Sequence, residues 1–178
     1  AENFSEWVKI YDHDYKGDSD PRIVIPFFDK SGNLIAAQGR AFNNTKLRYI
    51  TIKVEKDSQK IYGLDRVNLN KHVYVVEGPF DSMFLDNCIA MAGSDISDLS
   101  YVKDKVIVYD NEPRNVEIVK KMEKTIQSHI PLCIWPSGLN YKDINDIIIS
   151  GIDKVKLQSI IDENTYIGPV ATLKLNMW

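Results

Sequence analysis

Apolar residues follow two different patterns along this chain, and each pattern predicts its own kind of structure. Up to about residue 54 the apolar runs are short and are separated by turn-forming residues, which is typical of antiparallel strands. We predict strands at residues 23–28, 34–38 and 47–54, and a short helix near residues 4–10. The Asp-Lys-Ser-Gly-Asn sequence at 29–33 contains a turn-favouring glycine, so the first two strands are predicted to form a hairpin.

From residue 72 onward, continuous apolar runs alternate with stretches of helical period. Strands are predicted at 73–76, 89–92, 105–109 and 132–135, and the continuous apolar runs at 73–76 and 105–109 are expected to be buried. Helices are predicted at 79–87, 114–128, 143–150 and 153–161. The second of these has the clearest pattern, because Val116, Val119, Met122 and Ile126 recur at helical spacing. The alternation predicts an α/β fold: a small, mostly parallel sheet with helices on both faces.

The polar, turn-rich segment at 57–70 is a plausible joint between the two patterns. We therefore predict a small basic, mainly-β subdomain at 1–71, with an acidic leader at 1–21. An α/β domain follows at 72–162, and a C-terminal tail at 163–178 has no assigned role. A chain of 178 residues is long enough for one well-packed domain and a smaller one.

The composition is that of an ordinary soluble globular protein, with 44% apolar and 26% charged residues. No apolar run approaches the roughly 18 residues of a membrane-spanning helix, and no signal peptide is visible, so we expect a cytoplasmic protein without membrane association. Cys88 and Cys133 lie in apolar runs and are expected to be buried thiols. No cysteine and histidine spacing suits zinc, so no zinc is expected in this chain.

The net charge of −3 conceals a strong asymmetry along the chain. Residues 22–71 carry ten basic and four acidic side chains, whereas residues 72–151 carry seven basic and twelve acidic ones. A basic block beside an acidic one suits an enzyme that acts on nucleic acid, because one block holds phosphates and the other holds metal ions. Charged blocks are also common as solvated surfaces, so charge alone leaves both interpretations open.

Carboxylates stand where the predicted parallel strands end. Glu77 ends one strand, Asp110 and Glu112 follow another, and Asp143 and Asp146 open a later helix. Loops at the carboxyl ends of neighbouring parallel strands lie at one edge of the sheet, so these side chains are expected to meet. Several carboxylate oxygens around one hard cation are typical of a divalent-metal site that acts on phosphates.

Some of these acidic residues also have an ordinary structural explanation. Asp143 stands where a helix N-cap is expected, and Asp81 and Asp146 fall in first helical turns, where the helix dipole favours a carboxylate. Glu77 alone is also typical of an exposed loop. The combination of the motifs is therefore more specific than any one of them.

A second set of candidate site residues is basic and lies in the N-terminal part of the chain, where short apolar runs predict antiparallel strands. Arg40, Lys46 and Arg48 surround a polar turn and precede Tyr49. These side chains are candidates for binding phosphates, and Tyr49 for stacking on a single-stranded base. The alternative is a solvated edge strand whose charges discourage aggregation.

Taken together, the acidic motifs resemble those of the Toprim domain. A strand ending in glutamate is matched by Glu77 in VVEGPFD, and the later Asp-x-Asp by Asp110-Asn111-Glu112. A further Lys-Asp motif is matched by Lys142-Asp143 in KDIND. Glu112 replaces the second aspartate of Asp-x-Asp, which keeps the carboxylate but lengthens its reach. These motifs alone are also compatible with topoisomerases, nucleases and recombination mediators.

The segment upstream narrows the resemblance to the catalytic core of DnaG-like, bacterial- and phage-type DNA primases. Residues 22–35, RIVIPFFDKSGNLI, resemble the stretch RIxFPIxDxxGxxI that precedes the primase Toprim domain. Gln38-Gly39-Arg40 is similar to the family's GGR, Arg48-Tyr49 to its KY, and the IYGL at 61–64 to its LYGL. The similarity covers about residues 22–151, and the EGPFD and DNEP motifs look more like those of phage primases.

This resemblance implies a nucleotidyltransferase of DNA replication that synthesises short RNA primers on single-stranded DNA from NTPs. It implies Mg²⁺ or Mn²⁺, with two ions expected. The implied metal ligands and catalytic residues are Glu77, Asp110, Glu112 and Asp143, with Asp146 as a further metal ligand and Asp81 as an outer candidate. The implied NTP- or template-binding residues are Arg40, Lys46 and Arg48, with Lys142 neutralising charge beside the metal.

The implied partners are template DNA, NTPs, the RNA–DNA hybrid product and a replicative helicase, and the location is the host cytoplasm if the protein is phage-encoded. Two other functions remain open. One is a Toprim nuclease that uses the same metals, and the other is a non-catalytic module for single-strand binding or recombination mediation. The basic block at 22–71 favours the primase over the nuclease, and the complete set of carboxylates favours an enzyme over a binding module.

Overall fold

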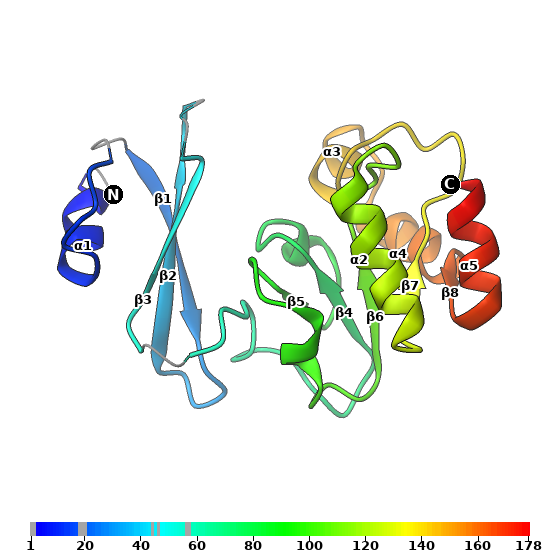
Figure 1. Cartoon of the computed structure of the whole chain (residues 1–178), viewed down its shortest axis with the longest axis horizontal. Coiled ribbons are helices and arrows are strands. Elements are labelled where there is room, and N and C mark those ends of the chain that lie inside the picture. The colour runs from blue at the N-terminus through cyan, green and yellow to red at the C-terminus, as the bar shows by residue number, and fades with distance from the viewer. Residues whose placement is uncertain (1–2, 18–20, 44, 46, 56–57) are drawn as a thin grey trace. The chain divides into compact units, whose positions relative to one another are not determined.

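The computed structural model describes the whole chain except residues 1–2, 18–20, 44, 46 and 56–57 (Figure 1). The chain forms two compact units, Ala1–Asp65 and Arg66–Trp178. Lys46, one of the residues predicted to bind phosphates, lies outside the described residues. Among the helices in the described parts, none is long and apolar enough to cross a membrane.

The first unit contains a three-stranded antiparallel sheet in the order β1-β2-β3, formed by β1 (Arg22–Phe28), β2 (Leu34–Ala41) and β3 (Tyr49–Lys53). The predicted hairpin between the first two strands is confirmed. Asp29 stabilises its turn, because its Oδ1 accepts hydrogen bonds from the backbone N–H groups of Ser31 and Asn33, each at 2.8 Å.

Helix α1 (Phe4–Tyr11) packs on this sheet and supplies Phe4 and Val8 to the core of the unit. The helix approaches closely because β2 carries Gly39 at the contact. A Cβ atom added to Gly39 would lie 2.5 Å from the ring of Phe4, which is fully buried. The glycine in the motif resembling GGR therefore has a packing role in this protein.

We expect Gly39→Ala to destabilise the first unit by about 1–2 kcal/mol, because the added methyl group forces the Phe4 ring out of its position. Denaturant unfolding would measure the loss. Adding Phe4→Leu to the Gly39→Ala chain should recover part of the stability, since the smaller side chain leaves room for the methyl group. Equal stability of Gly39→Ala and the parent chain would contradict this account.

Arg22 is a charged residue buried in the same unit, with only 2% of its surface exposed. Its Nη1 donates to the carbonyl oxygens of Gly39, at 3.2 Å, and Arg48, at 3.4 Å. Buried charges are tolerated when they are hydrogen-bonded. Arg22 therefore ties the first strand of the sheet to β2 and to the residue that precedes β3.

The second unit contains a five-stranded sheet in the order β5-β4-β6-β7-β8. Its strands are β4 (Val73–Val76), β5 (Cys88–Ala90), β6 (Lys105–Val108), β7 (Leu132–Cys133) and β8 (Thr165–Tyr166). The first four in this order are parallel, and β8 pairs antiparallel with β7. The predicted α/β class and mostly parallel sheet are confirmed, as are buried thiols at Cys88 and Cys133.

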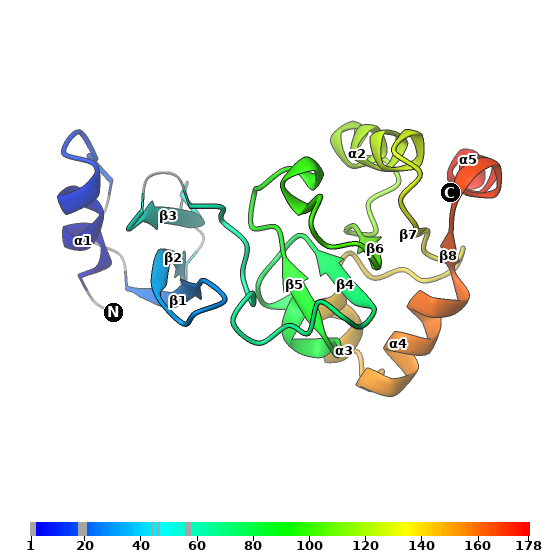
Figure 2. The ribbon, with the colours of Figure 1, turned by 90° about the horizontal axis from the view of Figure 1, so that it is seen from below.

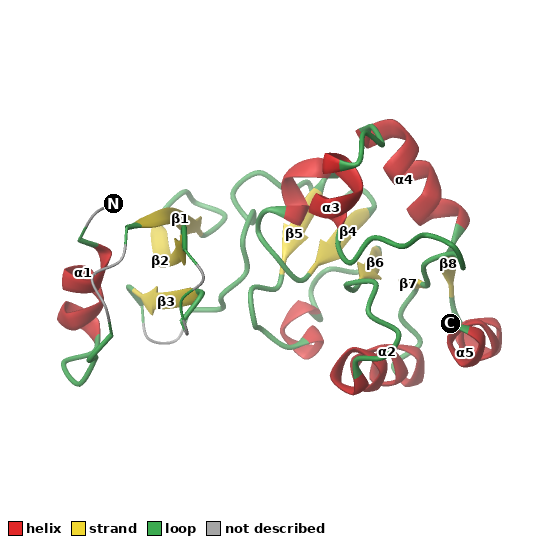
Figure 3. Ribbon diagram, turned by 90° about the horizontal axis from the view of Figure 1, so that it is seen from above, coloured by secondary structure: helices red, strands yellow, loops and turns green. Residues whose placement is uncertain are grey.

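Helices cover both faces of this sheet, as the alternating pattern predicted. The helices are α2 (Val116–Gln127), α3 (Ile144–Ile149), α4 (Lys154–Glu163) and α5 (Gly168–Met177), with short 3₁₀ turns η1 (Asp81–Phe84) and η2 (Ile96–Leu99). Figures 2 and 3 show α3 and α4 on one side of the sheet and α2 and α5 on the other.

Two local predictions need correction. The helix predicted at 79–87 is only the 3₁₀ turn η1, because the chain becomes extended at Leu85 and must enter β5 at Cys88. Asn87 adopts a positive φ of 48° and donates to the carbonyl oxygen of His72 at 2.7 Å, which fixes this early ending. In α2 the helix is confirmed, but Val116 lies on its exposed side, and the buried face consists of Ile118, Met122 and Thr125.

The compact units divide the chain after Asp65, which lies inside the segment 57–70 that was predicted as the joint, although the predicted domain boundary was residue 71. The segment predicted as a tail, 163–178, supplies β8 and α5 to the second unit. Helix α5 packs against α2, and β8 extends the sheet at β7. These are structural divisions, and the functional division into three parts stays a prediction.

Candidate metal centre

The sheet brings Glu77 and Asp110 together at one edge. Strands β4 and β6 are parallel neighbours, with Val76 paired to Val108, so the residues that follow them leave the sheet side by side. The backbone N–H of Asp110 lies 3.5 Å from Oε2 of Glu77. The carboxylate of Glu77 and the backbone of Asp110 therefore lie side by side at the carboxyl ends of these strands, where the site was predicted.

Asp110 lies at the centre of a group of acidic side chains. Burial, followed by the negative charges of Glu77, Asp81, Asp143 and Glu112, raises the pKa of Asp110 to about 7. These four carboxylates therefore repel a negative charge on Asp110. A divalent cation would relieve this repulsion, and carboxylate oxygens are the ligands that Mg²⁺ and Mn²⁺ prefer, so the donor set fits such an ion.

The side chains are not arranged as a closed metal site. Within the described residues, no three histidine, cysteine or acidic side chains are grouped closely enough to hold an ion. Two of the acidic side chains are held by lysines: Glu77 by Lys121 at 2.5 Å, and Glu112 by Lys142 at 3.3 Å. Metal binding would require these carboxylates to be shared with the cation or released by the lysines, and the ligand assignments stay predictions.

Asp143 and Asp81 have structural roles in addition to their place in the acidic group. Asp143 is the N-cap of α3, because its Oδ1 accepts from the N–H of Asp146 at 2.8 Å. Oδ1 of Asp81 accepts from the N–H of Asn145 at 3.1 Å. The two bonds fix both carboxylates at the start of α3, so the predicted cap and the predicted ligand are compatible roles for one residue.

Asp146 lies outside the group of carboxylates that act on Asp110. Asp146 is exposed in the first turn of α3, so its helical role is the better supported one.

Gly78 lies against the side chain of Asp81. A Cβ atom on Gly78 would lie 2.7 Å from Oδ2 of Asp81. Gly78 therefore allows Asp81 to approach the end of β4.

Asn111 lies between Asp110 and Glu112 in the predicted motif, but no role was predicted for its side chain. Its side-chain amide donates to the carbonyl oxygens of Leu139, at 2.7 Å, and Tyr141, at 2.9 Å. Its N–H donates to the carbonyl oxygen of Lys142 at 2.6 Å, and its Oδ1 accepts from Nε1 of Trp178 at 3.2 Å. Asn111 therefore fixes the Lys142-Asp143 segment beside the segment that carries Asp110 and Glu112.

We expect Asn111→Ala to weaken divalent-metal binding by about 10- to 100-fold, the usual cost of losing a side chain that orients metal ligands. Titration with Mn²⁺, followed by the loss of the free-ion signal in electron paramagnetic resonance, would measure the change. Trp178→Phe is the matched control, because it removes the bond to the amide oxygen but leaves the amide's bonds to Leu139 and Tyr141, and it should change affinity a few-fold at most. Unchanged affinity in Asn111→Ala would contradict the role.

The predicted basic residues lie in the first unit, apart from Lys142. The guanidinium of Arg40 lies 5.7 Å from the centre of the Tyr49 ring, its cross-strand neighbour, and the side chain of Arg48 is exposed. Lys142 contacts Glu112, as expected for a residue that neutralises charge at the acidic group. The roles of these residues toward NTPs or template stay predictions.

A cavity of about 620 Å³ borders the acidic group in the second unit. Glu112 and Lys142 lie on its wall, together with the aromatic side chains of Trp135, Tyr141 and Trp178. It is open to solvent and combines aromatic, amide and charged groups. This space is large enough for part of a nucleotide.

Searches against family models gave no match. By sequence, the chain is 34% identical over 184 residues to a DNA primase of Enterobacteria phage T4, an alignment that covers 98% of this chain and 54% of the phage protein. It is 25% identical to a DNA primase of Mycoplasma pneumoniae, over 78% of this chain and 26% of that protein. The chain thus spans about half or less of the length of these relatives.

The fold is that of solved primase domains. A DNA primase domain from Pseudomonas aeruginosa superimposes with a TM-score of 0.64 and 18% identity, covering 93% of this chain and 60% of that one. The DnaG primase catalytic domain bound to single-stranded DNA gives 0.61 and 18%, covering 80% and 51%. The primase fragment of the bacteriophage T7 primase-helicase protein gives 0.62 and 16%, covering 82% and 64%. By sequence, the chain is similar to DNA primases along nearly its whole length, and its fold is that of the catalytic core of DnaG primases.

Proposed function

We propose that this chain is the catalytic core of a DNA primase, which synthesises short RNA primers on single-stranded DNA from NTPs. The observation that carries the proposal is the acidic group around Asp110 at the ends of β4 and β6, in a chain 34% identical to a phage primase. Carboxylates of this kind, held at the edge of a parallel sheet, suit metal-dependent phosphoryl chemistry.

In the proposed reaction, the 3′-hydroxyl of one nucleotide attacks the α-phosphate of the next NTP, and pyrophosphate leaves. Glu77, Asp110, Glu112 and Asp143 would hold two divalent cations, Mg²⁺ or Mn²⁺, with Asp146 as a further candidate ligand. The bound ions would supply the positive charge that lowers the pKa of the hydroxyl and offsets charge developing on the phosphates. The chain's own part is to fix these carboxylates, through the Asp143 cap, the Asp81 bond and the Asn111 cross-links.

Basic side chains would hold the phosphates of the reactants. Lys142 stands beside Glu112 and is suited to bind an NTP phosphate next to the metal centre. Arg40, Lys46 and Arg48 would bind NTP or template phosphates, and Tyr49 offers an exposed ring on which a base can stack. We propose that basic residues also hold the phosphates of the RNA–DNA hybrid product.

The proposed partners follow from the relatives. One solved relative is a DnaG catalytic domain with bound single-stranded DNA, and another is a fragment of a primase-helicase protein. We propose accordingly that this chain binds a single-stranded template and works with a replicative helicase, in the host cytoplasm if the gene is carried by a phage.

The proposal is tested by incubating the chain with single-stranded DNA, labelled NTPs and Mg²⁺ and separating the products on a denaturing gel. Short RNA that disappears with EDTA is the expected product. Shortened DNA would replace the proposal with a Toprim nuclease. DNA binding that is insensitive to EDTA, with no product even when the zinc module of a related primase is added in trans, would replace it with a binding module.

A further inference from the structure

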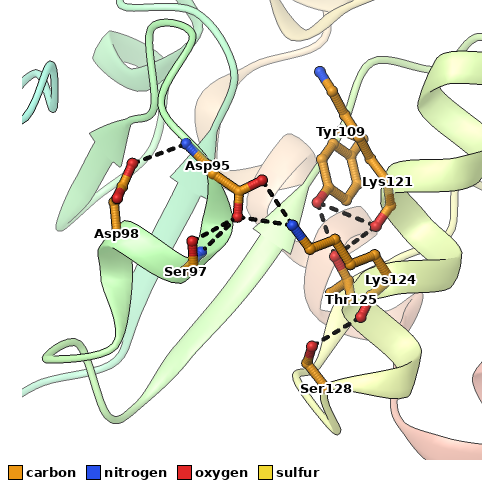
Figure 4. A network of polar contacts seen from close by, with 8 residues as sticks. All are labelled: Asp95, Ser97, Asp98, Tyr109, Lys121, Lys124, Thr125 and Ser128. Atoms are coloured by element: carbon orange, nitrogen blue, oxygen red, sulfur yellow. Dashed lines mark hydrogen bonds and ion pairs between the residues drawn. The ribbon is translucent and has the colours of Figure 1, made fainter.

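Helix α2 carries two lysines, one turn apart, that form ion pairs with different segments. Nζ of Lys121 lies 2.5 Å from Oε1 of Glu77, the residue that follows β4. Nζ of Lys124 lies 2.8 Å and 3.0 Å from the two carboxylate oxygens of Asp95, the N-cap of η2 (Figure 4). The two pairs have the same chemistry, but only one involves the candidate metal centre.

The turn of α2 that carries Lys121 is attached to the strand that leads to Asp110. The hydroxyl groups of Tyr109 and Thr125 are 2.8 Å apart, and the Thr125 hydroxyl donates to the carbonyl oxygen of Lys121 at 2.9 Å (Figure 4). Both Tyr109 and Thr125 are buried. Buried, fully satisfied polar contacts of this kind hold neighbouring segments in one arrangement. The backbone of Lys121 is therefore fixed relative to the end of β6.

The two lysines differ in what their partners do. The carboxylate of Glu77 is 20% exposed and is one of the charges that act on Asp110, whereas that of Asp95 is 51% exposed and is not one of them. The ammonium group of Lys121 therefore offsets charge within the acidic group, and it occupies an oxygen that a metal ion would use. Lys124 does neither.

We propose that Lys121 limits the metal affinity of the centre by competing with the cation for Glu77. This inference rests on the proposed function in one respect, that Glu77 is a metal ligand. A cation that binds at Glu77 must share the carboxylate with the ammonium group or displace it, and it also meets the positive charge nearby. Replacing Lys121 by a neutral side chain therefore strengthens metal binding.

The test is direct titration of the chain with Mn²⁺ in the absence of NTP, with the free ion followed by electron paramagnetic resonance. Lys121→Met is expected to raise the affinity about three- to tenfold, the size expected of one unit charge close to a divalent cation in a largely solvated, salt-screened site. Lys121→Gln repeats the neutralisation with a polar side chain, and Lys121→Arg, which keeps the charge, should retain the parent affinity. Lys124→Met is the matched control and should leave the affinity unchanged.

Several results would overturn the inference. Unchanged or weaker Mn²⁺ binding in both neutral variants would show that Lys121 orients Glu77 or is merely structural. An equal gain in Lys124→Met would show a general charge effect. An increased KM for NTP without a change in Mn²⁺ affinity would make Lys121 a phosphate-binding residue. The variant Glu77→Gln tests the metal centre separately from Lys121. If the parent chain binds Mn²⁺ and Glu77→Gln does not, Glu77 is a metal ligand whatever the Lys121 variants show. If both bind Mn²⁺ alike, both the proposed metal centre and the inference about Lys121 are refuted.

Discussion

Glu77→Gln and Asp110→Asn are each expected to abolish primer synthesis while leaving the chain folded. Each change removes one negative charge and keeps the size of the side chain, at the two positions where β4 and β6 leave the sheet. The expected loss is at least about 10²- to 10³-fold, as found when one preorganised electrostatic group is removed from an active site. Labelled RNA on a denaturing gel measures it, over a range of Mg²⁺ and Mn²⁺ concentrations.

Asp95→Asn is the matched control for these two variants. Asp95 is also an acidic residue paired with a lysine of α2, but it lies outside the charges that act on Asp110. It should retain most of the activity, and circular dichroism should show that all three variants fold. Metal-dependent synthesis at the parent rate by Glu77→Gln or Asp110→Asn would refute the assignment of metal ligands.

The part of the site that the sequence predicted depends on one rule of sheet geometry. Continuous apolar runs identified β4 and β6, and the ends of parallel neighbours necessarily lie together, so Glu77 and Asp110 could be placed side by side from the sequence. The N-cap at Asp143 follows from equally local chemistry, because an aspartate before a helical run bonds to the first turn.

The contacts that organise the site could not be predicted in this way. Lys121 and Glu77 are 44 residues apart, and Asn111 and Leu139 are 28 apart, so no local spacing connects them. A lysine on an exposed helix face and an asparagine in a loop are common, and only the folded chain shows that they contact the acidic group. Strand β8 could not be predicted either, because two residues are too few to show the alternating pattern of a strand.

Asp110→Asn is also expected to make the metal-free protein more stable at neutral and alkaline pH. Burial and four nearby carboxylates raise the pKa of Asp110 to about 7, against an ordinary value of 3.8, so the folded chain binds this proton more tightly than the unfolded chain does. The contribution of Asp110 to stability is therefore fully present below about pH 4 and is lost as the pH rises through about 7. At pH 8 the ionised carboxylate destabilises the fold, and the neutral amide removes this effect.

The expected size follows from the same shift in pKa. In a site closed to solvent, the free energy of unfolding of Asp110→Asn would exceed that of the parent by about 4 kcal/mol. Solvent screening in this part-exposed site reduces the difference to about 2 kcal/mol, which corresponds to about 4–8 °C in Tm. Scanning calorimetry in EDTA at pH 8 measures the gain, which should largely disappear at pH 4. A variant that is less stable than the parent at pH 8, or a difference that does not change with pH, would contradict the electrostatic account.

Mg²⁺ should reverse the order of stability of the two proteins. An ion that binds the folded parent stabilises it in proportion to the logarithm of its concentration above Kd, and Asp110→Asn should gain little because it lacks one of the ligands. The parent is therefore expected to melt at a lower temperature than Asp110→Asn in EDTA at pH 8 and at a higher temperature once enough Mg²⁺ is added. This crossing would link the acidic group to metal binding without any measurement of synthesis. If Mg²⁺ raised the Tm of both proteins equally, the ion would bind elsewhere.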